Sequence, residues 1–168
     1  MKMVRYLPGL LALVFLLGGC ATIVPPKYPF QATRTYEKDY DTVWSSVIEI
    51  FAQRNISIKT IEKVSGIVVS ENSKVPFQVQ PDLTYNSSYC DCGRPGGLVI
   101  LTDMKGRFNV FVRKITENAT SVQVNTAYHA LKQMGMHFVL GWNWECNSKG
   151  YMESIIFDDL DSRLGPGH

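Results

Sequence analysis

The sequence predicts an α+β domain in which an antiparallel sheet carries two amphipathic helices on one face. Three observations lead to this fold class. Helical stripes of apolar residues occur near the start and near the end of the chain. Alternating segments rich in β-branched residues lie between them and are joined by short turns. The chain has 168 residues and is 45% hydrophobic, which suits one domain with a core of its own.

The first 20 residues form a unit of their own. Lys2 and Arg5 precede an apolar run over 10–17, and Leu17-Gly18-Gly19 leads to Cys20. This order is typical of a secretory signal. A membrane-spanning helix fits less well, because a span needs about 20 apolar residues. A plain signal peptide is the other alternative, and the cysteine at the end makes the signal more specific than that. Leu-x-Gly before a cysteine resembles the lipobox of bacterial lipoproteins, which implies cleavage after Gly19 and acylation of Cys20 with chains such as palmitate.

We therefore expect a signal peptide over 1–19, a lipidated tether over 20–29 and a single domain over 30–168. Pro25-Pro26 favours an extended, semi-rigid tether. In lipoproteins of enteric bacteria an Asp after the acylated cysteine favours the inner membrane. Ala21 stands there, so the resemblance implies a lipid anchor on the periplasmic face of the outer membrane.

The charge balance argues against nucleic acid as a partner. The predicted signal holds two of the 17 basic residues and none of the 15 acidic ones, so 15 of each remain. Phosphate binding needs a basic surface, which a neutral chain does not supply. We expect contact with the membrane to come from the lipid, since two or more acyl chains hold stably.

The first half of the predicted domain begins with a strand over 30–36 and a helix over 39–54. Asp39 is placed to cap this helix, and Asn55 can end it in a left-handed conformation. Its apolar stripe comprises Val43, Trp44, Val47, Ile48 and Phe51. A β-hairpin follows, with strands over 56–61 and 67–70. The proline- and glycine-rich stretch 72–97 predicts a long loop with a short edge strand at 75–79.

The second half predicts an antiparallel meander and a final helix. The three strands cover 98–104, 107–115 and 121–131, with a turn at Lys105-Gly106 between the first two. A loop rich in Met and Trp is expected over 132–145. Ser148 can cap the last helix, 150–164, whose apolar stripe comprises Met152, Ile155, Ile156 and Leu160.

Three cysteines remain after Cys20, in a compartment that favours disulfides. An odd number predicts one bridge and one thiol. Cys90 and Cys92 are too close to pair without strain, so Cys146 is expected to pair with one of them. The alternative is a metal site that uses these cysteines with His129 or His137. We expect no metal and no cofactor, because zinc-type spacing is absent.

We expect no enzymatic activity, because the chain lacks nucleophile-elbow, zinc-protease and phosphate-loop motifs. Asp158, Asp159 and Asp161 resemble paired acids, but on a helix they are expected to form its solvated face. Trp142 and Trp144, with Met136 and Phe138, are instead candidates for a partner contact, because tryptophan is enriched at interface hot spots. The alternative is that they seal the core beside the disulfide.

Several motifs, taken in order, resemble those of a known group of proteins. They are Tyr40-Asp41-x-Val43-Trp44-x-x-Val47, then Ile58-Lys59-x-Ile61-x-Lys63-x-x-Gly66-x-Val68-Val69, then Asp91-Cys92-Gly93 and Cys146-x-Ser148-x-Gly150-x-x-Glu153. With a lipobox in front, this order resembles the small Gram-negative periplasmic lipoproteins with a helix-grip-like domain. The C subunit of the outer-membrane barrel-assembly machine is similar in shape.

The resemblance implies a fold and a location but no reaction. It also implies that the bridge is Cys92–Cys146 and that Cys90 is the additional thiol. We expect a protein-binding or scaffold module with an envelope protein as partner. The alternative is a carrier or sensor of a small apolar ligand held between helix and sheet.

Overall fold

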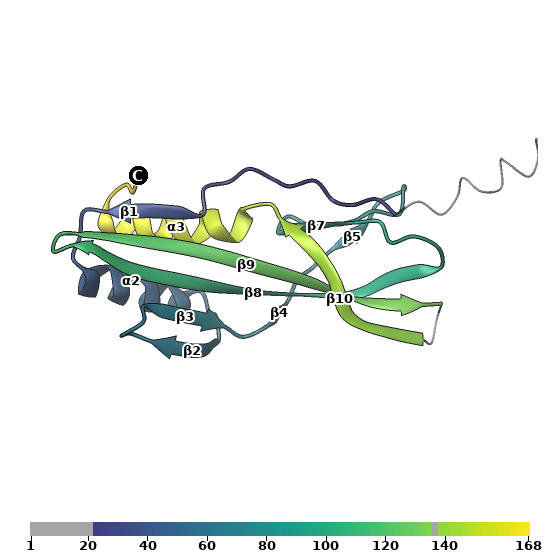
Figure 1. Ribbon diagram of the computed structural model, residues 1–168, viewed down its shortest axis with the longest axis horizontal. Helices are drawn as coiled ribbons and strands as arrows, with labels where there is room; N and C mark the ends of the chain where they lie inside the picture. The colour runs from purple at the N-terminus through teal and green to yellow at the C-terminus, as the bar shows by residue number, and fades with distance from the viewer. Residues whose placement is uncertain (1–21, 136–137) are drawn as a thin grey trace, which may run out of the picture.

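The computed structural model describes residues 22–135 and 138–168. Over these ranges the chain is an α+β domain with two helices and a large antiparallel sheet, as the sequence predicts (Figure 1). The predicted signal peptide, Cys20 and Met136 lie outside the described residues. Within the described ranges, no helix has the length and apolar character needed to cross a membrane.

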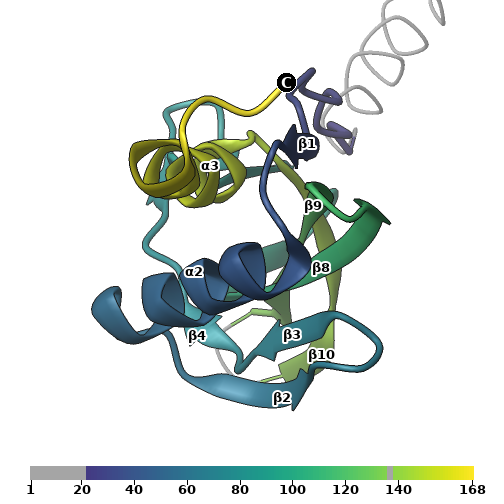
Figure 2. The ribbon, with the colours of Figure 1, turned by 90° about the vertical axis from the view of Figure 1, so that its left-hand side faces the viewer.

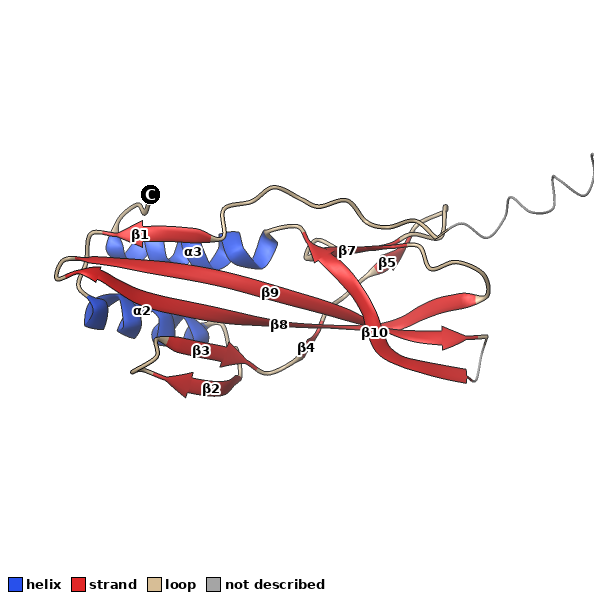
Figure 3. Cartoon of the chain, viewed as in Figure 1, coloured by secondary structure: helices blue, strands red, loops and turns tan. Residues whose placement is uncertain are grey.

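Two helices and ten strands make up the described part of the chain. The helices are α2 (Tyr40–Gln53) and α3 (Tyr151–Leu164). The strands are β1 (Thr33–Tyr36), β2 (Ile58–Glu62), β3 (Ile67–Ser70), β4 (Ser73–Lys74), β5 (Gln78–Val79), β6 (Tyr85–Asn86), β7 (Cys90–Gly93), β8 (Val99–Thr116), β9 (Ala119–Met134) and β10 (Phe138–Ser148). Figure 3 shows the long strands β8 and β9 running along the molecule, with both helices toward one end.

β8 and β9 are the longest strands and form the spine of the sheet. They pair from Val99 opposite Met134 to Thr116 opposite Ala119. The sheet order is β2-β3-β8-β9-β10-β7-β6-β5, with β1 also on β9 and β4 also on β8. Every pairing between these strands is antiparallel.

Local sequence accounts for α2. The Asp39 carboxylate accepts a 3.0 Å hydrogen bond from the Thr42 backbone N–H, which caps the first turn as predicted. Asn55 follows the helix with φ 52°, the left-handed conformation expected of it. The buried stripe of α2 comprises Val43, Trp44, Val47, Ile50 and Phe51. The predicted β2–β3 hairpin is also confirmed.

α3 begins differently from the prediction. Gly150, at φ 81°, is its N-cap, and Ser148 makes no cap bond to the helix. The Ser148 hydroxyl is instead hydrogen-bonded to the Glu153 carboxylate, at 3.0 Å, and accepts from the Gly150 N–H. The helix then buries Ile156, as predicted, and Phe157, which lies beside the predicted stripe.

Both helices cover the same face of β8 and β9 (Figure 2). Their stripes meet the inward side chains of these strands in one core. Its largest fully buried members are Tyr36, Phe51, Phe157, Ile50, Ile156 and Leu160. This part of the fold agrees with the predicted two-layer arrangement.

The predicted turn at Lys105-Gly106 is wrong, since β8 runs through both residues without a break. Gly106 serves packing instead. A Cβ on Gly106 would come within 2.6 Å of the Tyr128 ring, which lies opposite it on β9. A glycine inside a strand often marks such a close approach rather than a turn.

The two predicted loops are wrong as well, although the short edge strand predicted at 75–79 is present in part as β5. Residues 72–97 contain β4 to β7, because short strands fit between the prolines and glycines. Residues 138–148 form β10, which pairs with β9 on one side and with β7 on the other. β10 changes register near Gly141, and this irregularity hides its alternation in the sequence. A second core of Tyr85, Cys90, Met104, Tyr128 and neighbouring residues holds these strands together.

Candidate functional site

A three-stranded arm projects away from the helices at one end of the long axis (Figure 1). We define this distal arm as three ranges: 98–102 at the start of β8, 131–135 at the end of β9, and 138–143 at the start of β10. Several large apolar side chains on it are exposed, with Leu98 at 81% and Phe138 at 68%. Patches of this kind mark contact sites on soluble proteins.

The four residues predicted to contact a partner lie in different surroundings. Phe138 and Trp142 are exposed on the distal arm, and the Lys105 ammonium lies 4.1 Å from the centre of the Trp142 ring. Trp144 packs against the second core, and its indole N–H donates a 2.7 Å hydrogen bond to the Cys92 carbonyl. Trp144 therefore seals the core beside the disulfide, which was the alternative reading of the sequence. Met136 lies outside the described residues.

The segment predicted as a tether is hydrogen-bonded to the domain from residue 23 onward. Ile23 and Arg94 exchange two backbone hydrogen bonds of 2.9 Å. The Asn147 amide donates to the carbonyls of Pro25 and Pro26. A Cβ on Gly93 would collide with the Ile23 carbonyl, so this glycine allows the segment to lie close to β7.

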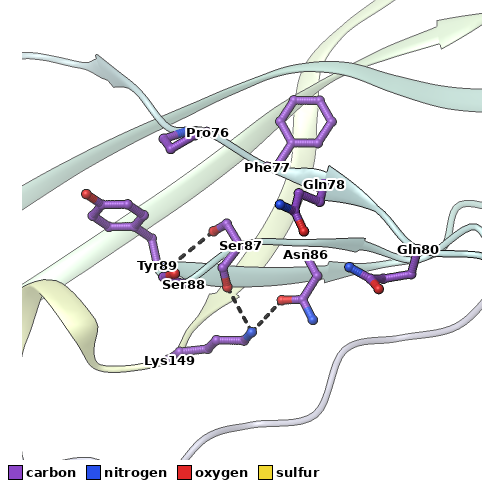
Figure 4. Close-up of a pocket in the computed structure, with 9 residues that line it drawn as sticks. All are labelled: Pro76, Phe77, Gln78, Gln80, Asn86, Ser87, Ser88, Tyr89 and Lys149. Carbon is purple, nitrogen blue, oxygen red and sulfur yellow. Dashed lines mark hydrogen bonds between the residues drawn. The ribbon is translucent and has the colours of Figure 1, made fainter.

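A groove of about 510 Å³ opens beside the edge of the sheet (Figure 4). Its lining is polar and partly aromatic, and comprises Pro76, Phe77, Gln78, Gln80, Asn86, Ser87, Ser88, Tyr89 and Lys149. β5 is the last strand in the sheet order, and among the described strands only β6 pairs with it. The groove is lined by residues of both β5 and β6, and the other edge of β5 has no partner among the described strands. Such an edge can accept another extended segment.

Lys149 fixes one wall of this groove. Its ammonium donates to the Asn86 side chain and, at 2.8 Å, to the Ser87 carbonyl (Figure 4). The side-chain amides of Gln78 and Gln80 line the groove and make no hydrogen bond to the rest of the described chain, so they can bind a ligand. The sequence analysis did not identify this groove. The sequence signal for the groove is Pro81 between two short runs, Gln78-Val79 and Tyr85-Asn86, which form β5 and β6.

The three cysteines of the domain lie together under Trp144. The Cys92 and Cys146 sulfur atoms are 1.98 Å apart, which is disulfide distance, and Cys90 is a buried free cysteine. Burial raises the pKa of the Cys90 thiol to about 11. The Met104 sulfur lies 3.2 Å from the Cys90 sulfur, so the thiol has an apolar, sulfur-rich environment.

These cysteines are also the one group in the described chain that could hold a metal ion. Their sulfur atoms lie within 4.8 Å of one another. With Cys92 and Cys146 joined, one thiol is left, and soft metals bind thiolates rather than disulfides. His129 does not join this group, and His137 lies outside the described residues.

A smaller cavity, of about 200 Å³, lies between the C-terminal end of α2 and the sheet. Val75, Phe108 and Met152 supply apolar walls, and Tyr128 is 4% exposed. The buried Tyr128 hydroxyl has no hydrogen-bond partner in the described chain. A donor left without a partner is costly to bury, so this cavity suits a small molecule with an apolar body and an acceptor group.

The acidic residues of α3 hold elements together. Asp161 pairs with Arg34 at 2.6 Å and accepts a 2.9 Å hydrogen bond from the Tyr36 hydroxyl. Asp159 accepts from the Arg54 guanidinium at 2.8 Å and so joins α3 to the end of α2. Asp158 is exposed, as expected of a solvated helix face, whereas that expectation is wrong for Asp159 and Asp161, which are partly buried by these ion pairs.

Comparison with known proteins does not extend this description. No protein-family model matches the chain. No curated protein matches it either. The function is therefore argued from the residues and the geometry of the chain itself.

Proposed function

We propose that this protein is a lipid-anchored periplasmic lipoprotein of the outer membrane that acts as a protein-binding or scaffold module in the cell envelope. The signal-like start and Cys20 support the anchor. Two helices on one face of an antiparallel sheet agree with the proposed helix-grip-like fold. An envelope protein is the proposed partner.

The observation that carries the protein-binding role is the groove beside β5. An extended peptide can add to the free edge of β5 through backbone hydrogen bonds, while side pockets select its side chains. Gln78 and Gln80 offer amide donors and acceptors, and Phe77 and Tyr89 offer aromatic surface. Exposed Val79 and Leu83 extend the apolar surface around the groove.

Photocrosslinking in cells tests this role. A photoreactive amino acid is placed at Val79 beside the groove, at Phe138 on the distal arm, and at Ser45, an exposed control position on α2. We expect a protein adduct from Val79 and none from Ser45. No adduct from Val79 contradicts groove binding, and an adduct from Phe138 alone moves the contact to the arm.

The cavity at Tyr128 supports a second candidate function, that of a carrier or sensor of a small ligand. Its apolar walls and its unpartnered hydroxyl are the specific observations in favour. Native mass spectrometry of the gently purified protein tests this function. A retained small molecule that is lost in Tyr128→Phe supports the carrier, whereas a protein free of ligand favours the scaffold.

A further inference from the structure

The exposed apolar residues of the distal arm lie at the end of the molecule where the described chain begins (Figure 1). Leu98, Phe138 and Val139 are 81%, 68% and 56% exposed. Ile23 and Val24, at the start of the described chain, are exposed as well. This end of the long axis therefore exposes a group of apolar side chains. The helices lie toward the other end (Figure 1), where further apolar side chains such as Val64 and Ile115 are also exposed.

Apolar side chains occupy both faces of the arm. Residues paired directly across strands share a face of the sheet. Met134 pairs with Phe138, while Gln133 lies between Ile100 and Val139 in the next register position, on the opposite face. A protein docked flat on the arm would cover one of these faces. An apolar medium that surrounds the tip would cover both.

The position of the N-terminal segment indicates that this medium is a lipid bilayer. Its two hydrogen bonds to Arg94 hold Ile23 on the domain. Cys20 lies three residues before Ile23, so a lipid on Cys20 is attached within about 10 Å of it even if the chain between them is fully extended. The bilayer that takes up this lipid must then lie close to the arm end of the domain.

We propose that the distal arm inserts its tip into the headgroup region of the leaflet that holds the Cys20 lipid. This inference rests on the lipid anchor of the proposed function and adds a second point of membrane contact. The three ranges of the arm contain no Asp or Glu, which favours insertion. The arm also has open strand edges, and unpaired backbone groups are not tolerated in the hydrocarbon core. Insertion is therefore shallow, about 5–10 Å, as for interfacial segments.

Tryptophan and lysine side chains lie behind the apolar tip, where headgroups would be. The Lys105 ammonium contacts the Trp142 ring, and the Lys132 ammonium lies 5.5 Å from the centre of the Trp144 ring. Tryptophan is enriched at membrane interfaces, and lysine extends its charge toward phosphate while its stem stays on apolar surface. This arrangement fits a phospholipid surface.

The test uses the full-length, acylated protein in vesicles of phosphatidylethanolamine and phosphatidylglycerol. One set of vesicles carries bromine near the carbonyl end of the acyl chains, where it quenches tryptophan emission on contact. Trp44 is buried in the first core and Trp144 packs against the second core, whereas Trp142 is exposed on the arm. We expect brominated lipid to quench part of the emission of the wild-type protein, and this loss to disappear in Trp142→Phe.

A matched pair of charged variants supplies the control. Phe138→Glu places a carboxylate on the arm, whereas Val64→Glu places one at the β2–β3 turn toward the opposite end, where Val64 is 98% exposed (Figure 1). We expect the first variant to lose quenching and the second to retain it. Vesicle flotation separates the two proposals. Protein that floats without Trp142 quenching overturns insertion but not the anchor, and protein that does not float overturns both.

Discussion

The Tyr28 hydroxyl donates a 2.6 Å hydrogen bond to the Asp91 carboxylate and so fastens the start of the described chain to β7. Asp91 stands between two cysteines in the sequence, and its other oxygen accepts from the Gly93 N–H at 2.8 Å. One carboxylate therefore shapes β7 and holds the N-terminal segment at the same time. In the proposed lipoprotein, this contact sets the orientation of the domain relative to its anchor.

Tyr28→Phe is expected to loosen this segment without unfolding the domain. A hydrogen bond to a charged group contributes about 1.5–3 kcal/mol, and partial exposure puts this one toward the lower end. Hydrogen exchange followed by mass spectrometry should show faster exchange over residues 22–30 and unchanged exchange in α2. Tyr151→Phe, a change at a half-exposed tyrosine, is the matched control. Equal exchange over 22–30 in Tyr28→Phe and wild type would count against the fastening role.

Cys90 is expected to be unreactive in the folded protein. Burial raises its pKa from 9.0 to about 11, so little thiolate, the reactive form, is present near neutral pH. Because the folded state holds the proton more tightly, the resulting stability is present below pH 9 and is lost as pH rises from 9 to 11. Iodoacetamide should label Cys90 slowly in buffer and rapidly in urea. In Cys90→Ala, this loss of stability between pH 9 and 11 should be absent, whereas rapid labelling of the native protein would refute burial of the thiol.

The bounds of α2 could be predicted from the sequence because residues next to the helix set them. The cap at Asp39 and the left-handed Asn55 act within one turn of α2, so the bounds of this helix followed from its own residues. The break predicted at Gly106 failed for the opposite reason. The function of Gly106 depends on the Tyr128 ring, 22 positions later in the sequence and opposite it on β9.

The candidate site was harder to predict because long-range pairing creates it. β10 becomes a strand through β9 and β7, and β5 reaches the sheet through β6 and β7. The groove exists once these short strands assemble, and Lys149 reaches it from a position more than 60 residues away in the sequence. Spacing alone left both Cys90 and Cys92 as possible partners of Cys146. The choice of Cys92 came from the family resemblance.

Trp44→Ala is expected to be the most damaging single substitution in α2. Trp44 is 5% exposed and stacks on Tyr40 in the first core. A large-to-small core change of this kind costs about 3–5 kcal/mol. Urea unfolding measures the loss, with the exposed Trp142→Ala as control and an expected cost below about 1 kcal/mol. A similar small loss in Trp44→Ala would mean that α2 does not bury its stripe as described.

The last prediction concerns the bridge between Cys92 on β7 and Cys146 on β10. β7 and β10 pair through two residue pairs, which are Asn147 with Asp91 and Ser148 with Cys90. β6 and β5 reach the sheet only through β7 within the described strands. The bridge therefore contributes much of the attachment between β10 and the strands that carry the groove.

Changing both cysteines to Ser should release these strands before the rest of the domain unfolds. The two cysteines are 54 positions apart in the sequence, for which the chain-entropy estimate is about 4 kcal/mol, an upper figure because measured values often fall short. Hydrogen exchange should speed up in β5 to β7 and in the first turn of α3, and much less in β8 and β9. Urea unfolding gives the total loss, and Cys90→Ala is the control that keeps the bridge. Peptide mapping without reduction decides the pairing, since a Cys90–Cys146 peptide would move the bridge by two residues and three free thiols would rule it out.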